Sequence, residues 1–244
     1  MIRLSYVVRP FVAYFLRGEK YTDPIDGNSY RKFLPYGYEN VRENVLAPGT
    51  LSLERHRLLW LYLKNETKFF SEKLKVLHFA PEQAFHQRFK KLKNLDYTTT
   101  DLNSPIADVK ADICNLPFED NSFDFIICNH VLEHIPNDTK AMQEVYRVLT
   151  PNGTTIFQVP LENKRLTTFE DDTITDKKQR AEIFGQYDHV RIYGMDFFEK
   201  LASVGFKVDA VDYTNNFSEK EIDKYRLAKG ELIPVCRKVI EISF

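Results

Sequence analysis

The sequence has few cysteines, a single tryptophan and no long apolar run near its start. Its three cysteines, Cys114, Cys128 and Cys236, are an odd number and contain no close pair. They cannot supply a disulfide framework or a cysteine zinc site, and they are typical of a reducing compartment. The longest uncharged run of the first twenty residues, 10–16, is too short for a signal-peptide core or a membrane span. We therefore expect a cytoplasmic protein.

The sequence also lacks an excess of charge of either sign. It has 34 basic and 35 acidic residues, for a net charge of −1, so nothing favours nucleic acid as a partner. Hydrophobic residues make up 43% of the 244 positions, which is enough for a sizeable core in a soluble globular protein. The length fits one large domain, alone or with a small extension.

The hydrophobic pattern divides the chain near residue 73. Residues 1–73 are rich in turn formers, followed by a helix that Ser52 is expected to cap, and we interpret them as an N-terminal extension. Residues 74–244 alternate strand and helix patterns, which predicts a parallel α/β sheet. A charged stretch, 161–182, predicts a surface loop or lid. The expected strands are Leu74–Phe79, Tyr97–Thr100, Val109–Ile113, Phe123–Cys128, Thr154–Val159, Phe206–Tyr213 and Ile233–Ile242, and the expected helices are Gln83–Lys93, one capped by Asp138, and Met195–Val204.

Acidic residues stand where the first strands of this sheet are expected to end. Ligands of open α/β sheets bind outside the carboxyl ends of the strands. Asp101 follows the second strand, nineteen residues after Glu82, and one carboxylate there can accept from both hydroxyls of a ribose. Asp112, near the end of the third strand, can accept from an exocyclic amine such as that of adenine. Each residue alone favours an ordinary turn or cap, but the ordered set favours a nucleoside site.

Three stretches of this region carry a family resemblance. They are D-I-C-N-L-P-F-E-D-N-S-F-D (112–124), H-V-L-E-H-I (130–135) and E-V-Y-R-V-L-T-P-N-G (144–153). Together they resemble class I S-adenosylmethionine-dependent methyltransferases over 74–244. The resemblance implies a Rossmann-like sheet of seven strands, mostly parallel with the last strand antiparallel, and helices on both faces. It also implies S-adenosyl-L-methionine as the cofactor.

The first motif departs from the family pattern because it has no glycine. The family usually shows an acidic residue followed by G-x-G-x-G, whereas this chain reads K-V-L-H-F-A-P-E-Q-A (75–84). No residue there is expected to take a positive φ cheaply. A subgroup of bacterial methyltransferases with the His-Phe-Ala-Pro-Glu version looks similar, and Glu82 can then receive the methionine ammonium group. The resemblance implies these cofactor-binding residues: His78, Ala80, Pro81, Glu82, Asp101, Asp112, Ile113, Asn129 and His130.

Methyl transfer chiefly requires that acceptor, methyl group and sulfur be aligned, with a base for some acceptors. The segment 184–194 looks like the acceptor side of similar enzymes, and we take His134, His189 and Arg191 as the candidate catalytic residues. The alternative, equally weighted, is that His189 and Arg191 only pair with local carboxylates. A small molecule, either a metabolite or a glycan or lipid precursor, is the expected acceptor. A non-catalytic binding module that has lost the cofactor is the alternative function.

Two patterns evoke zinc, and we expect a metal at neither. His130–His134 spells H-x-x-E-H, an inverted zinc-peptidase signature, but it directly follows a strand and Pro136 ends any helix. Similar proteins also carry a zinc knuckle of two C-P-x-C pairs before a Leu-Glu-Arg-His-Arg helix. The thiol positions hold Asp23, Asp26, Ala47 and Thr50, so the knuckle shape is expected to persist without metal, held by the packing of Phe33, Leu34, Tyr36 and Tyr38.

The start of the chain and the start of the Ser52 helix each allow two interpretations. Residues 1–20 interleave aromatic and basic side chains, which is typical of weak membrane-surface contact, although packing as a lid on their own domain is the safer expectation. Arg55 and His56 either approach the cofactor or acceptor or, as we favour, belong to a solvated or capping helix start.

Overall fold

The computed structural model describes residues 2–37 and 41–239, with the backbone alone for 2–8. Tyr38 and the predicted strand end at Ile242 lie outside the described residues. The chain forms two compact units, each built from separate stretches. The first unit runs to Glu72 and takes in Glu82–Leu92 and Asp212–Leu232. The second unit consists of Lys73–Pro81, Lys93–Val211 and the chain from Ile233 onward.

The first unit contains two small antiparallel hairpins and four α-helices in its described residues. Strands β1 and β2 form one hairpin, and β3 and β4 form the other. The aromatic rings of Tyr21, Tyr30 and Phe33 pack together and are buried with Leu16 and Ala47. The elements are α1 (Ile2–Phe15), β1 (Arg17–Thr22), β2 (Ser29–Tyr30), β3 (Leu34–Tyr36), β4 (Arg42–Leu46), α2 (Glu54–Glu66), α3 (His86–Phe89), η2 (Tyr213–Asn216) and α7 (Glu219–Tyr225).

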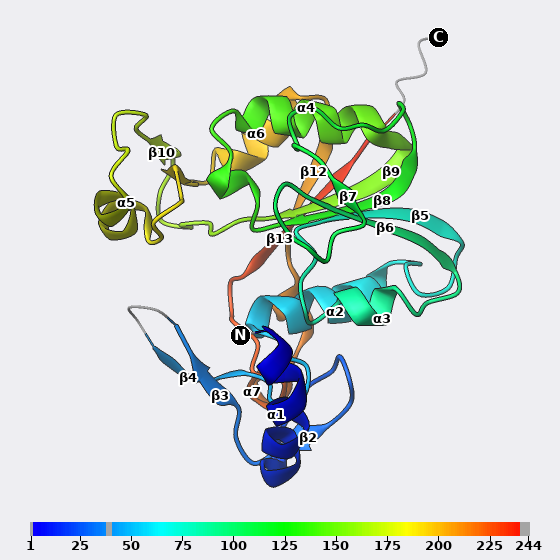
Figure 1. Cartoon of the computed structure of the whole chain (residues 1–244), viewed down its shortest axis with the longest axis vertical. Coiled ribbons are helices and arrows are strands. Elements are labelled where there is room, and N and C mark those ends of the chain that lie inside the picture. The colour runs from blue at the N-terminus through cyan, green and yellow to red at the C-terminus, as the bar shows by residue number, and fades with distance from the viewer. Residues whose placement is uncertain (1, 38–40, 240–244) are drawn as a thin grey trace. The chain divides into compact units, whose positions relative to one another are not determined.

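The second unit is built around the seven-stranded sheet, ordered β12-β13-β9-β8-β5-β6-β7 (Figure 1). The pairs β5–β6, β5–β8, β6–β7 and β8–β9 are parallel, and β13, the last strand, runs antiparallel to β9. The predicted Rossmann-like methyltransferase sheet is therefore confirmed. Its elements are β5 (Leu74–Phe79), β6 (Leu95–Asp101), β7 (Val109–Lys110), β8 (Phe123–Asn129), η1 (Leu132–His134), α4 (Asp138–Val148), β9 (Leu149–Gln158), β10 (Phe169–Glu170), α5 (Lys177–Phe184), β11 (Arg191–Ile192), α6 (Phe197–Ser203), β12 (Lys207–Asp212) and β13 (Leu232–Arg237).

The core of this unit lies between the sheet and helices α4 and α6, which lie together on one side of it (Figure 1). Leu77, Ile126 and Phe157 from the strands pack with Met142 of α4 and Leu201 of α6 in one buried cluster. Each such side chain contributes about 1.5–3 kcal/mol through burial. This packing holds the central strands in place, and with them the loops at their carboxyl ends.

Three predicted elements differ from the structure: a helix and a strand are shorter, and a predicted loop contains regular structure. The predicted helix Gln83–Lys93 is one α-helical turn, because the amides of Phe85 and Arg88 bond three residues back and make tight turns at its start. The predicted third strand pairs only over β7, since the chain turns at Asp112. The predicted irregular loop 161–182 contains β10 and part of α5, and β10 pairs with β11.

Two predicted helix caps are wrong. Helix α4 is capped by Asn137, whose side chain accepts from the amide of Lys140, while the Asp138 carboxylate bonds to Tyr193 and Lys200. Helix α2 begins after Leu53, because the hydroxyl of Ser52 is used in a bond to Asp23. In both places a tertiary partner takes the side chain that the local pattern assigns to the cap. Among the described residues, no helix combines the length and hydropathy that crossing a bilayer requires.

Candidate functional site

A cavity of about 380 Å³ opens at the carboxyl ends of β5, β6, β7 and β8. This is the edge of the sheet where open α/β folds bind their ligands, because the loops leaving parallel strands diverge there. All of its lining belongs to the second unit. The lining residues are Phe79, Ala80, Thr100, Asp101, Leu102, Asn103, Ala111, Asp112, Ile113, His130, Val131, His134, Ile135 and Asp188.

The two predicted nucleoside carboxylates both line this cavity. In Asp101, Oδ1 accepts from the amides of Asn103 and Ser104 at 2.7 and 2.6 Å. In Asp112, Oδ1 accepts from the amide of Cys114 at 2.8 Å. The turn role is present and does not exclude the predicted binding role, because it uses one oxygen of each carboxylate. In the described part of the chain, Oδ2 of Asp101 has no hydrogen bond, so it is available to a ribose hydroxyl.

Two residues of the cavity have a left-handed backbone. Ala80 follows β5 with φ of 45°, and His130 follows β8 with φ of 52°. The amide of Ala80 donates to Thr100 at 2.9 Å, and that of His130 donates to Gln158 at 2.7 Å, so bonds to neighbouring strands hold both conformations. The first motif therefore adopts a positive φ without a glycine, which agrees with the expectation that no residue there does so cheaply. Ala80 takes the conformation that a glycine would take, at a cost of about 1–2 kcal/mol.

Four of the predicted cofactor residues do not line the cavity: Glu82, in the first unit, and three residues of the second unit. His78 is fully buried in β5, and its Nδ1 lies 2.8 Å from Oη of Tyr97. Pro81 and Asn129 are buried beside the cavity residues Ala80 and His130 but are not part of its wall. The geometry favours a supporting role for these three side chains.

Glu82 belongs to the first unit, where it meets the start of α2. Its Oε1 lies 2.7 Å from Nε2 of His56 and 3.9 Å from Nε of Arg55. The Nδ1 of His56 accepts from the amide of Leu53 at 2.9 Å, so Nε2 carries the hydrogen and donates to Glu82. His56 is thus a capping residue of α2, and both it and Arg55 position the Glu82 carboxylate.

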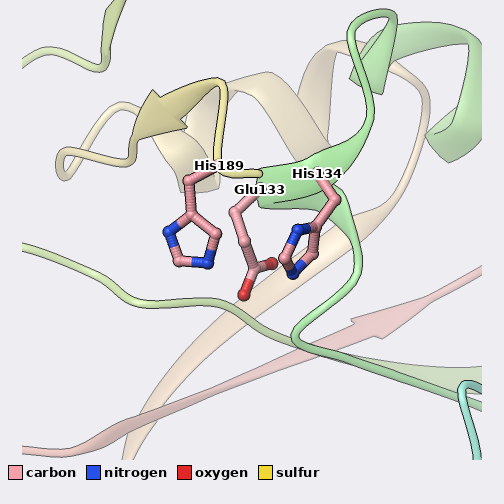
Figure 2. A group of neighbouring side chains, drawn as sticks. All are labelled: Glu133, His134 and His189. Carbon is pink, nitrogen blue, oxygen red and sulfur yellow. The ribbon is translucent and has the colours of Figure 1, made fainter. Parts of the chain in front are cut away.

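At the rim of the cavity, two segments bring histidines together. His134 ends η1 and lines the cavity, and His189 follows α5, with the two ring centroids 4.7 Å apart (Figure 2). Asp188 also lines the cavity, and its Oδ2 lies 3.4 Å from Nδ1 of His134. His189 is buried, and its Nδ1 donates to the carbonyl of Phe184 at 3.1 Å. Burial is the main cause that lowers the pKa of His189 below its ordinary value of 6.5.

Arg191 holds the rim but does not line the cavity. Its guanidinium is buried and donates to the carbonyls of Leu132, Ile135 and Pro136 and to the carboxylate of Glu170. These bonds fix the loop between β8 and α4 against β11. The geometry therefore favours a positioning role for Arg191 over a catalytic one.

Three polar residues of the cavity wall are absent from the predicted set: Thr100, Asn103 and Asp188. Thr100 and Asn103 lie beside Asp101, so their position at a strand end could have predicted that they line the cavity. Asp188 lies within the segment assigned to the acceptor side, but nothing in the local sequence shows that it reaches His134, 54 positions earlier.

Comparison with known proteins agrees with this fold. Residues 63–157 match the family described as "Methyltransferase domain". Demethylmenaquinone methyltransferase of Staphylococcus epidermidis is 44% identical over 45 residues, which are 18% of this chain and 19% of that protein. An uncharacterized protein of Methanocaldococcus jannaschii is 28% identical over 116 residues, 48% of this chain and 54% of that protein. The chain thus matches a fifth to a half of these relatives' lengths.

Solved structures share the fold over a larger part of the chain. The YcgJ protein of Bacillus subtilis aligns with a TM-score of 0.51 at 13% identity, covering 76% of this chain and 100% of that one. The [4+2]-cyclase SpnF aligns with a TM-score of 0.52 at 17% identity, covering 90% of this chain and 92% of that one. Residues 63–157 are thus similar to a methyltransferase domain, and the seven-stranded sheet has the fold of these solved structures.

Proposed function

We propose that the protein is an S-adenosylmethionine-dependent methyltransferase that acts on a small-molecule acceptor. The observation that carries the proposal is the pair of carboxylates, Asp101 and Asp112, on one cavity at the carboxyl edge of the sheet. A ribose beside Asp101 and an adenine beside Asp112 and the buried side chain of Ile113 fit the polarity of this wall. The methyltransferase domain match over residues 63–157 supports the same cofactor.

The acceptor side of the proposed enzyme is the rim formed by His134, Asp188 and His189. His134 and Asp188 line the same cavity as the carboxylates, so a group held there faces the cofactor. A donor aligned with its acceptor in this way gains about 7–11 kcal/mol from orientation alone, and the sulfonium is already activated. His134 acts on the acceptor atom, His189 acts through its contact with the His134 ring, and Arg191 positions the loop that carries His134.

The chemical class of the acceptor is proposed as a small metabolite or a glycan or lipid precursor. The matched relative named for demethylmenaquinone supports the lipid branch of this class, and a quinol of that type is a suitable first acceptor to assay. The match covers a fifth of that relative, so the assay should also include soluble hydroxylated acceptors.

Calorimetric titration with S-adenosylmethionine and S-adenosylhomocysteine tests the proposal. The full chain should bind both at micromolar concentration, and Asp101→Asn should weaken binding at least tenfold because a carboxylate accepting from a diol is replaced by an amide. Asp96→Asn is the matched control, since Asp96 lines a different cavity beside the amino ends of β5 and β6. Absence of binding at millimolar ligand would support the alternative, a non-catalytic module, and equal affinity in Asp101→Asn would refute the ribose assignment.

A further inference from the structure

Glu133, His134 and His189 converge from two segments that are far apart in the sequence. Figure 2 shows the Glu133 carboxylate between the two imidazole rings. One potential ligand atom from each residue lies within 4.8 Å of the other two. Glu133 and His189 are buried, and His134 is at the cavity rim. Two histidines and one carboxylate are a recurrent ligand set for first-row divalent metals.

The Glu133 carboxylate is incompletely paired. The residue is 1% exposed, and its Oε1 lies 3.1 Å from Nδ1 of His130. Its Oε2 is buried and has no hydrogen-bond partner in the described part of the chain. A buried carboxylate oxygen without a donor is costly, and native structures rarely leave one without a reason. A cation beside Oε2 would remove that cost.

The two histidines have the outer contacts that metal ligands commonly have. A backbone carbonyl can only accept, so the bond from His189 to Phe184 places the ring hydrogen on Nδ1 and leaves a lone pair on Nε2. His134 has the Asp188 carboxylate beside its Nδ1, which favours the same tautomer. Metal-bound histidines typically donate their second ring nitrogen to a carbonyl or carboxylate in this way.

The H-x-x-E-H interpretation of the sequence used a different ligand set. It required His130 and His134 on one helical face, whereas His130 is directed at Glu133 and has its Nδ1 beside Oε1. The third ligand in the folded chain is His189, which the motif does not contain. The expectation of no metal rested on the motif alone, and the tertiary arrangement changes that conclusion.

We infer that Glu133, His134 and His189 bind one divalent transition-metal ion of the zinc class at the rim of the cavity. Bonds of about 2.0–2.2 Å require ligand atoms closer together than 4.8 Å, so His134, the least buried of the three, rotates inward on binding. Three protein ligands leave a coordination position open. That position would take an oxygen of the acceptor, such as a hydroxyl or enolate, and this last part rests on the proposed function.

Zinc chloride titrated into the tag-free, chelator-treated chain of 244 residues tests the site, with calorimetry and elemental analysis after dialysis. We expect one equivalent of zinc. Glu133→Gln and His189→Gln should each weaken binding at least tenfold, and the same change at His86, a histidine of the first unit, should leave it unchanged. Asp188→Asn, at a side chain that is 41% exposed, should weaken binding about tenfold without disturbing the fold.

The outcomes separate the metal site from the proposed function. The metal site would be overturned if the wild-type chain failed to retain zinc. It would also be overturned if folded Glu133→Gln and Asp188→Asn variants retained as much zinc as the wild type. Binding of S-adenosylmethionine by a chain that binds no zinc would leave the methyltransferase proposal intact. Zinc binding without cofactor binding would support the metal site and contradict the methyltransferase proposal.

Discussion

Two buried carboxylates, one in each unit, show opposite arrangements. Asp23, in the first unit, is fully buried, and its oxygens accept from the amide of Ile25 and the hydroxyls of Thr50 and Ser52. Glu133 is equally buried but leaves one oxygen without a donor. A carboxylate whose donors are all supplied by its own chain supports structure, whereas one that lacks a donor is suited to a ligand.

The Asp23 network lies in the segment for which the sequence predicts the shape of a zinc knuckle without metal. Asp23 and Thr50, two of the four residues that the resemblance places at thiol positions, bond directly to each other. The predicted packing is present for Phe33, which belongs to the buried cluster, and for Leu34, which is partly buried against it, whereas Tyr36 is exposed. This segment therefore combines hydrogen bonds with part of the predicted packing, and the knuckle shape and its lack of zinc stay predictions.

The largest expected effect is the loss of stability when the Asp23 carboxylate is removed. Asp23→Ala removes the acceptor of three buried donors, and we expect it to lower the free energy of unfolding by about 3 kcal/mol or more. Urea denaturation followed by circular dichroism measures this. Asp26→Ala, at a neighbouring thiol position where the carboxylate accepts one exposed bond from Asn28, should cost less than about 1 kcal/mol. Equal losses in the two variants would contradict the structural role of Asp23.

A smaller effect concerns the strained turn of the cavity. Ala80→Gly should raise the free energy of unfolding by about 1 kcal/mol, since glycine adopts a φ of 45° without strain. The same substitution at Ala202, exposed within α6, should lower it by a similar amount. Thermal unfolding of both variants gives the comparison, and a destabilised Ala80→Gly would show that the methyl group supplies needed packing.

For Glu133, the comparison predicts a substitution that hardly changes the free energy of unfolding. Glu133→Gln should change the free energy of unfolding by less than about 1 kcal/mol, because the lost charge had no partner at Oε2. Denaturation of the chelator-treated protein in urea is the measurement. A loss as large as that of Asp23→Ala would mean that Glu133 is a structural carboxylate and is not reserved for a ligand.

The pH dependence of stability should also differ between two buried aspartates. Burial is the main cause that raises the pKa of Asp23 above 3.8, so its contribution is fully present below that pH and is lost as pH rises through the folded pKa. For Asp138, burial raises the pKa, but the interactions with Arg191, Tyr193 and Lys200 outweigh burial, so the pKa lies below 3.8. Its contribution is present above pH 3.8 and is lost as pH falls through the folded pKa.

Urea denaturation of Asp23→Asn and Asp138→Asn across roughly pH 3 to 7 tests these signs. As pH rises, the loss of unfolding free energy relative to the wild type should increase for Asp138→Asn. For Asp23→Asn, the same loss should decrease. Parallel profiles for the two variants would contradict the assigned causes.

The sequence predicts well what short-range patterns determine. Strand β5 has the predicted bounds because its apolar residues are buried along most of its length. The parallel core and the places of Asp101 and Asp112 follow from strand ends, which local patterns locate. These positions depend on burial and turn chemistry within a few residues of the chain.

What depends on distant partners could not be read from the sequence. The cap of α4 falls to Asn137 because Tyr193 and Lys200 engage Asp138. The segments of His189 and His134 are joined by the bond from the amide of Val190 to the carbonyl of Glu133 and by the bonds of Arg191 to the carbonyls of residues 132, 135 and 136. No periodicity or spacing records such contacts, so the rim of the site needs coordinates.

A crystal structure of the full chain with S-adenosylhomocysteine tests the proposed cofactor site most directly. We expect electron density for the adenosyl group in the cavity at the carboxyl ends of the strands, with both ribose hydroxyls at Asp101 and the sulfur directed toward His134. Density at another surface, or an empty cavity at millimolar ligand, would contradict the proposed site.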